Sequence, residues 1–134
     1  MSIFSSPRFL RYVLLADAAS CLTTGAVQVA FTVALEHVLQ LPAALLGGTG
    51  WFLLIYGAAV AWFAVHEHVP RALVWALVAG NLGWAAASLA LLASGWVAPT
   101  AWGIAWVLAQ AATVTVLAEL QWTALRRSRP IGWA

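Results

Sequence analysis

The side chains most able to do chemistry in this chain are four polar residues inside long apolar stretches: Asp17, Tyr56, Asn81 and Glu119. Counted from the nearest arginine or histidine at about 1.5 Å per residue, they lie at similar depths, one in each stretch. A charged group in hydrocarbon costs at least about 2.5 kcal/mol, so these side chains should face protein, a cavity or a partner. The sequence therefore predicts a polar layer across a helix bundle.

This layer has two interpretations. If Asp17 and Glu119 lie close together they would share a proton, because two like charges repel at short range. The layer would then be a proton-coupled site or a polar ligand pocket. The alternative is structural: the side chains form hydrogen bonds between helices, or the two carboxylates reach toward nearby arginines.

A second, uncharged layer is expected nearer the other end of the bundle, and it consists of Gln28, Ser88 and Gln110. Three of the nine tryptophans lie deep enough to face protein or a bound ligand: Trp84, Trp102 and Trp106. Indole rings beside amides and hydroxyls are suited to a flat apolar ligand, such as a quinone, a sterol-like molecule or a tetrapyrrole. Packing and anchoring at the membrane surface explain such rings more often than a ligand does.

The elements that must position these residues are marked by the five prolines. They bound four apolar stretches, at roughly 7–35, 42–65, 70–92 and 99–125, and none falls inside a stretch, where it would break a helix. Each stretch reaches the 20 or so apolar residues needed to cross a bilayer. We therefore expect one domain over residues 1–134, a four-helix transmembrane bundle.

Composition supports a membrane protein independently. Hydrophobic residues make up 64% of the chain and charged residues 7%, and the mean hydropathy is +0.93. Soluble proteins carry about 25% charged residues, so the lipid bilayer is the expected environment. The basic residues do not form a patch with exposed aromatics, which argues against nucleic acid as a partner.

Orientation follows from the arginines, which supply all six positive side chains. Four crossings place every one of them on the same side, and that side is the cytoplasm by the positive-inside rule. Both termini are then cytoplasmic, and residues 126–134 form a short basic cytoplasmic tail. Abundant alanine without lysine fits a bacterial coding bias, so the expected location is a bacterial inner membrane.

The starts of the first and third stretches resemble each other. The segments 7–16 and 70–79 share a Pro-Arg-x-Leu-x-aromatic-x-Leu-x-Ala pattern. Such an echo indicates either two helical-hairpin repeats or convergence of two helix starts at the same membrane surface.

Catalytic and metal sites are not indicated by the sequence. Cys21 is the single cysteine, which excludes a dithiol redox motif within the chain. His37 is expected on one side of the membrane, and His66 and His68 on the other, so a haem held by two histidines of one chain is not expected. No metal site, catalytic residue or specific cofactor is assigned.

Several segments also resemble the small four-pass inner-membrane proteins of proteobacteria. They are 6–11, 14–20, 41–46, 81–84, 94–100 and 118–120, and together they extend over nearly the whole chain. The resemblance implies the same four-pass topology and contributes no chemistry.

The sequence thus favours a non-catalytic membrane protein, either an accessory or assembly subunit or a binder of an apolar small molecule. It would act as a homo-oligomer or within a larger membrane complex. One alternative is a small proton-coupled transporter, working as a homodimer in which Asp17 and Glu119 titrate. A second alternative is a membrane enzyme that acts on a lipid or isoprenoid.

Overall fold

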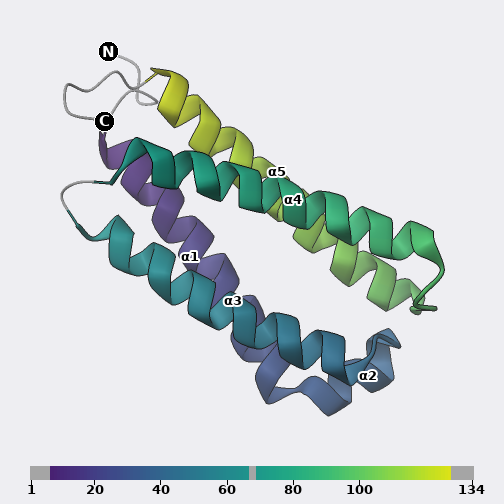
Figure 1. The fold of residues 1–134 in the computed structure, drawn as a ribbon. Coiled ribbons are helices and arrows are strands. Elements are labelled where there is room, and N and C mark those ends of the chain that lie inside the picture. Colours follow the sequence, from purple (N-terminus) through teal and green to yellow (C-terminus); the bar gives the residue numbers. More distant parts are fainter. Residues whose placement is uncertain (1–6, 67–68, 128–134) are drawn as a thin grey trace.

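The computed structural model describes residues 7–66 and 69–127, and these ranges are helical apart from short connections (Figure 1). The helices are α1 (Pro7–Ala30), α2 (Thr32–Leu39), α3 (Ala43–Ala64), α4 (Arg71–Ser94) and α5 (Ala101–Arg127). All except α2 are long and apolar enough to cross a membrane, which makes four candidate spans. The all-α class and the four long apolar helices are therefore confirmed. The expected basic tail lies outside the described residues from 128 onward.

The prediction of one helix over 7–35 is wrong at its end, because the helix breaks at Phe31 and α2 follows. Phe31 leaves the helical region with φ −119° and ψ 32°. Next to it, the Thr32 hydroxyl donates to the Gln28 carbonyl oxygen over 2.5 Å, a contact that bends helices. An unbroken helix as far as Leu39 would be about 50 Å long, against a hydrocarbon thickness of about 30 Å.

Prolines, a carboxylate and a glycine set the ends of the next helices. Pro42 and Pro70 directly precede α3 and α4, with φ of −57° and −60°. The Ala43 amide at the start of α3 donates to Glu36 Oε2 over 2.7 Å, so Glu36 caps this helix from α2. Gly95 ends α4 with φ 79°, a conformation that favours glycine.

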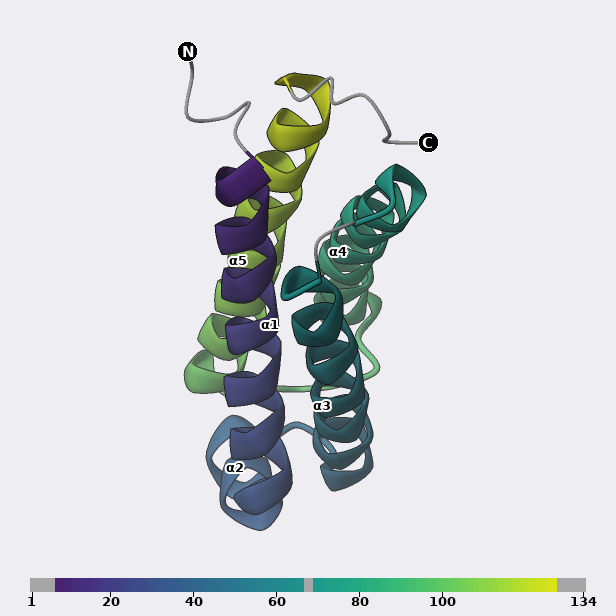
Figure 2. The ribbon, with the colours of Figure 1, turned by 90° about the vertical axis from the view of Figure 1, so that its left-hand side faces the viewer.

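The long helices pair within two hairpins. α1 packs along α3, and α4 packs along α5, while α1 and α2 supply the backbone contacts with α5 that join the hairpins. Over their described lengths, no Cα atoms of α3 and α4 approach within 8 Å, and the two helices diverge in Figures 1 and 2. The start of α1, the end of α3, the start of α4 and the end of α5 lie together, at what we call the arginine end.

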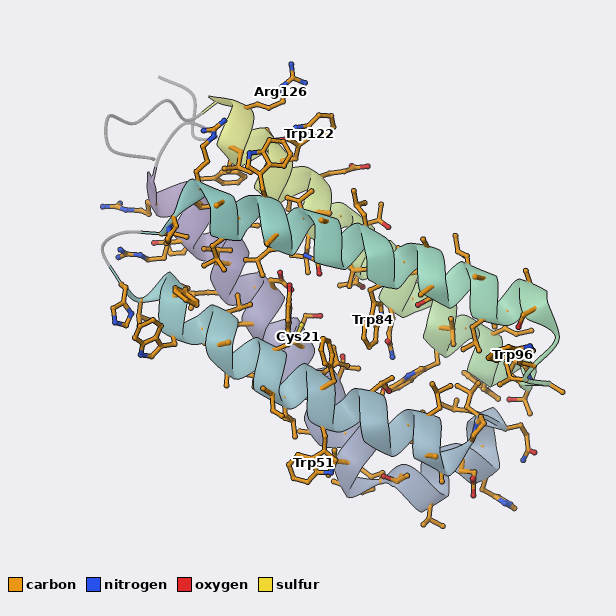
Figure 3. All side chains as sticks on the ribbon, viewed as in Figure 1. Cys21, Trp51, Trp84, Trp96, Trp122 and Arg126 are labelled. Atoms are coloured by element: carbon orange, nitrogen blue, oxygen red, sulfur yellow. The ribbon has the colours of Figure 1, made fainter. Side chains whose placement is uncertain are left out.

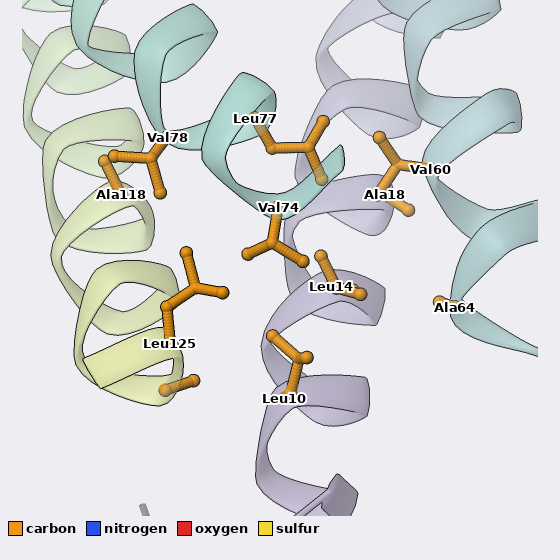
Figure 4. Close-up of a cluster of buried hydrophobic side chains, with 11 residues drawn as sticks. Leu10, Leu14, Ala18, Val60, Ala64, Val74, Leu77, Val78, Ala118 and Leu125 are labelled. Atoms are coloured by element: carbon orange, nitrogen blue, oxygen red, sulfur yellow. The ribbon is translucent and has the colours of Figure 1, made fainter. Parts of the chain in front are cut away.

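The main apolar core lies toward the arginine end and draws on all four long helices (Figure 4). α1 contributes Leu14, which is completely buried, and α4 contributes Val74. Val60 of α3 and Leu125 of α5 complete the cluster from the two sides. Side chains therefore join the hairpins here, although the backbones of α3 and α4 stay apart.

The opposite end is joined by hydrogen bonds between α2 and the start of α5. The Thr100 backbone amide donates to the Leu39 carbonyl over 3.1 Å, and the Thr100 hydroxyl donates to the Val38 carbonyl over 2.8 Å. Gly103 packs directly against the Leu39 carbonyl, where a side chain would clash. The two hairpins are thus fixed to each other at both ends, and the polar residues lie between these fixed points.

Candidate functional site

The first polar cluster joins α1, α4 and α5 around Asp17, which is completely buried. The Gln121 side-chain amide donates to Asp17 Oδ2 over 2.7 Å, and the Asn81 amide donates to the same oxygen over 3.1 Å. Asn81 also donates to Gln121 Oε1 over 3.1 Å, which closes the triangle. The Cys21 thiol reaches Asp17 Oδ1 at 3.6 Å. We call these four residues the Asp17 cluster.

Asp17 and Asn81 therefore meet as expected, but the close approach of Asp17 and Glu119 that the proton-sharing interpretation requires does not occur. Glu119 is exposed on α5, and Gln121 takes its place. The reason is helical phase: buried residues of α5 recur at three- and four-residue steps along one face, at Val107, Ala111, Val114, Ala118, Gln121 and Leu125, with Leu117 and Ala124 beside them. Glu119 falls between these steps, on the outward face.

Tyr56, the fourth residue of the expected layer, does not join the hydrogen bonds. Its ring packs against the apolar core, and its hydroxyl oxygen is buried without a hydrogen-bond partner among the described residues. This oxygen lies near Gly80 of α4, at which an added Cβ would sit 3.9 Å from it. Tyr56 thus reaches across from α3 to α4 beside the Asp17 cluster.

The second polar cluster joins α1, α3 and α5 around Gln28, which is 2% exposed. Gln28 Nε2 donates to the Leu46 carbonyl and to the Thr49 hydroxyl, each over 2.8 Å. Gln28 Oε1 accepts from the Trp106 indole over 3.3 Å and from the Gln110 amide over 3.0 Å. We call Gln28, Thr49, Trp106 and Gln110 the Gln28 cluster.

The orientation of both amides in this cluster follows from their partners. The Leu46 carbonyl can only accept and the Trp106 indole can only donate, so the nitrogen and oxygen of Gln28 are fixed. The atom of Gln110 that faces Gln28 Oε1 must then be its nitrogen, which leaves Gln110 Oε1 as the outer atom. Gln28 and Gln110 meet as expected, whereas the Ser88 hydroxyl instead donates to the Trp84 carbonyl of its own helix.

Two neighbouring cavities border the Gln28 cluster and share Trp84, Trp106 and Gln110 as walls. The smaller has a volume of about 190 Å³ and is lined further by Ser20, Cys21, Thr24, Leu53, Ala109, Thr113 and Val114. The larger has a volume of about 290 Å³ and is lined further by Gln28, Leu41, Leu45, Leu46, Thr49, Ala87, Ser88, Leu91 and Val107. Asp17, Asn81 and Gln121 line neither cavity.

The deep tryptophans divide between the cavities and the surface. Trp84 and Trp106 are half-buried and line both cavities, and Figure 3 shows Trp84 pointing into the space between the hairpins. Trp102 is 73% exposed and lines neither cavity, contrary to the prediction that it faces protein. It is the second residue of α5, so it lies nearer the end of the bundle than the Gln28 cluster does. Its ring is exposed at that end.

An aromatic row bridges α3 and α4 where their backbones stay apart. The Phe52 ring stacks on Trp84, with 5.8 Å between the centroids and 12° between the planes. Phe52 also stacks on Tyr56 at 5.9 Å. Phe52 is 51% exposed, so the outer side of this aromatic row lies at the protein surface between α3 and α4.

Gln121, Cys21 and Thr49 are the members of these clusters that were not among the predicted site residues. Gln121 continues the three- and four-residue recurrence of buried positions on α5, so a register count along that helix would have found it. Thr49 offered no comparable signal, because a single hydroxyl in a small-residue stretch is usually bonded to its own helix. Among the described residues, no group of three or more His, Cys, Asp or Glu side chains could hold a metal ion.

No family model, curated protein or solved structure matches this chain.

Proposed function

We propose that this protein binds a neutral, largely apolar small molecule within the membrane, in the larger cavity, and has no catalytic chemistry of its own. The observation that carries the proposal is the convergence of Trp84, Trp106 and Gln110 on a cavity of about 290 Å³ between the hairpins. Apolar walls with a few fixed polar groups are the usual composition of small-molecule sites. The hydrogen bonds of Gln28 hold two of these three walls in place before a ligand arrives.

The carboxylates give less support to the transporter alternative within one chain. Proton coupling through Asp17 and Glu119 requires the two groups to influence each other, whereas Glu119 is exposed and Asp17 is enclosed by amides. The enzyme alternative needs a reactive group at a substrate site. The cavities present amides, hydroxyls, indoles and one thiol, and the thiol of Cys21 is already directed at Asp17.

The cavity proposal is tested by filling the cavity. Ala86 and Ala87 are neighbours on α4 and both are exposed, but Ala87 lines the larger cavity and Ala86 lines neither cavity. Mass spectrometry of protein purified from native membranes should detect a small organic molecule bound to the wild type and to Ala86→Phe. Ala87→Phe should lose it. If the two variants retain the same small molecules as the wild type, the cavity is not the binding site.

For topology, we propose that the arginine end is cytoplasmic and that the host membrane is a bacterial inner membrane. The support is the arginine bias, with Arg8, Arg11, Arg71 and Arg126 at one end of the bundle. In a Cys21→Ala background, an impermeant thiol reagent applied to intact cells should label a cysteine at His37 and spare one at Ser128. The opposite labelling pattern would reverse the orientation.

A further inference from the structure

We infer that the ligand of the larger cavity carries a hydroxyl group, which donates a hydrogen bond to the side-chain oxygen of Ser88 or of Gln110. The inference deepens the proposed function and rests on it. It follows from counting which hydrogen-bonding groups of the cavity wall are already occupied and which are left for a ligand.

The amide and indole donors of the wall are largely consumed within the protein. Gln28 uses its side-chain nitrogen on the Leu46 carbonyl and the Thr49 hydroxyl. The Trp106 indole uses its only N–H on Gln28 Oε1. Gln110 directs one amide hydrogen at the same oxygen. A ligand therefore cannot take these hydrogens without breaking the cluster.

The hydroxyl protons of the wall are occupied as well. Thr49 donates to the Leu45 carbonyl over 2.6 Å, and Ser88 donates to the Trp84 carbonyl over 2.8 Å. A hydroxyl group has one proton and two lone pairs, so each of these oxygens can still accept. Thr49 already accepts from Gln28, whereas Ser88 accepts from no described residue.

Gln110 Oε1 is the second unused acceptor. It faces away from Gln28, because the Gln110 nitrogen is turned toward that residue. Among fully enclosed side-chain nitrogen and oxygen atoms of the described residues, only the Tyr56 hydroxyl has no partner. Gln110 Oε1 has no partner among the described residues either, so it retains accessible surface with respect to them, and Gln110 lines both cavities.

Among the residues that line the larger cavity, the unused groups are therefore the Ser88 and Gln110 oxygens as acceptors, with the Trp84 indole N–H and one Gln110 hydrogen as donors; Trp84 and Gln110 line the smaller cavity as well. A ligand hydroxyl serves both kinds, since it donates one hydrogen bond and accepts others. An ether or ketone has no proton to donate, so it can satisfy neither oxygen of the wall. None of the lining residues is charged, so a neutral molecule is favoured over an acid or an amine.

The volume sets the size of the molecule. A cavity of about 150 Å³ holds benzene, and the larger cavity here measures about 290 Å³. A molecule of two fused rings with a small substituent therefore matches this volume. Suitable probes are trans-2-decalol, which carries a hydroxyl on an apolar bicyclic skeleton, and its methyl ether, which cannot donate.

The experiment titrates each probe into the full chain in lipid nanodiscs and follows tryptophan fluorescence, because Trp84 and Trp106 line the cavity. Probe concentrations are expressed per lipid, which removes the difference in partitioning between the two molecules. In Ala87→Phe the cavity is filled, so any fluorescence change on adding a probe comes from tryptophans outside the cavity and is subtracted as background. One buried hydrogen bond should make the alcohol bind about 5- to 10-fold more tightly than the ether.

Variants locate the hydrogen bond. The double change Ser88→Ala with Gln110→Leu should bring the affinity ratio of the two probes close to 1. The ratio does not depend on the fraction of folded protein, so partial destabilisation by the Gln110 change does not affect it. Ser94→Ala is the matched control, since Ser94 also donates to a carbonyl of α4 but lines neither cavity, and it should keep the wild-type ratio.

The outcomes separate the two proposals. Equal binding of alcohol and ether to the wild type overturns the hydroxyl inference and leaves the cavity as a binding site. Tighter binding of the ether also overturns it. If neither probe gives a signal above that of Ala87→Phe, the proposed function fails together with the inference. A preference for the alcohol that survives the double change shows that the hydroxyl does not meet Ser88 or Gln110.

Discussion

The Asp17 cluster and the Gln28 cluster are both polar groups buried in an apolar bundle, and both involve α1 and α5. They differ in whether their unused groups border the larger cavity. The amides around Asp17 are directed at one another; Asn81 Oδ1 accepts from no described residue, but Asn81 lines neither cavity, and Cys21 is the member of this cluster that borders a cavity, the smaller one. The Gln28 cluster forms a wall of the larger cavity and leaves Gln110 with an unused oxygen. Buried polarity alone therefore does not identify a ligand site; unused hydrogen-bonding capacity at a cavity does.

The strongest test of this comparison is the loss of a donor to Asp17. Gln121→Leu removes the shortest hydrogen bond to a completely buried carboxyl group, at 2.7 Å, and also the acceptor of Asn81. Hydrogen bonds to charged groups contribute about 1.5 to 3 kcal/mol, and the lost neutral bond adds to this. We expect the free energy of unfolding, measured by steric trapping in bicelles, to fall by about 3 kcal/mol.

Its control is a double-mutant cycle with Asp17→Asn. If the cost comes from the carboxyl group, Gln121→Leu should destabilise the Asp17→Asn protein by less than half as much as it destabilises the wild type. Equal losses in both backgrounds would mean that Gln121 acts through packing and not through its hydrogen bond to the Asp17 carboxyl group.

A smaller loss is expected at the second cluster. Gln28→Leu deprives Trp106, Gln110 and the Leu46 carbonyl of a partner. These groups are neutral, and Trp106 and Gln110 border a cavity where water can replace the lost partner. We therefore expect a loss of about 2 kcal/mol in the free energy of unfolding. In the nanodisc assay the same variant should also lose binding of trans-2-decalol, whereas Gln121→Leu should retain it in the protein that remains folded.

A further test concerns the close contact between the backbones of α1 and α3 beside the Gln28 cluster. A Cβ at Gly50 would meet the Gln28 Cβ and a Val29 methyl group at 3.0 Å, so Gly50→Ala pushes the two helices apart at the Gln28 cluster. Overpacking of this kind costs about 1 kcal/mol or slightly more. Gly48→Ala is the control: a Cβ there meets nothing within 4 Å, and the helix should gain about 0.5 kcal/mol. Measured by steric trapping, the free energy of unfolding should fall in Gly50→Ala and rise in Gly48→Ala.

The smallest effect is expected at Glu119, which is exposed and bonded to neither cluster. Glu119→Gln should change the free energy of unfolding by less than about 0.5 kcal/mol. Binding of trans-2-decalol should also be unchanged between pH 5 and pH 8. A pH-dependent difference between this variant and the wild type would revive a role for Glu119 in proton coupling and contradict its placement outside the site.

The long helices were predictable because two strong signals coincide, apolar length and the positions of the prolines. The break at Phe31 was not, since it depends on the Thr32 hydroxyl and on where α2 meets α5, and neither leaves a mark in the hydropathy. Depth along each helix was estimated well enough to bring Asp17 together with Asn81, and Gln28 with Gln110.

Rotation about the helix axis was the weaker part of the sequence reasoning. Counting from the arginines gave Glu119 the right depth, but a shift of two residues turns a side chain by about 200° and moves it from the core to the surface. Trp102 shows the reverse problem, because it shares a face with Trp106 but lies too near the helix start to reach the cavity. Depth and rotation must therefore be assigned together, and the register of the small buried residues of α5 was the available guide.

The hydrogen bonds of Asp17 also have a consequence for how the protein is made. Its partners Asn81 and Gln121 follow it by 64 and 104 residues in the chain. At a synthesis rate of about 5 to 20 residues per second, Asp17 waits about 3 to 13 s for its first amide and about 5 to 21 s for its second. During that interval the Cys21 thiol of the same helix is the partner of Asp17 that has already been made. Chains that stop before α4 lack both amides that bond to Asp17 in the complete bundle.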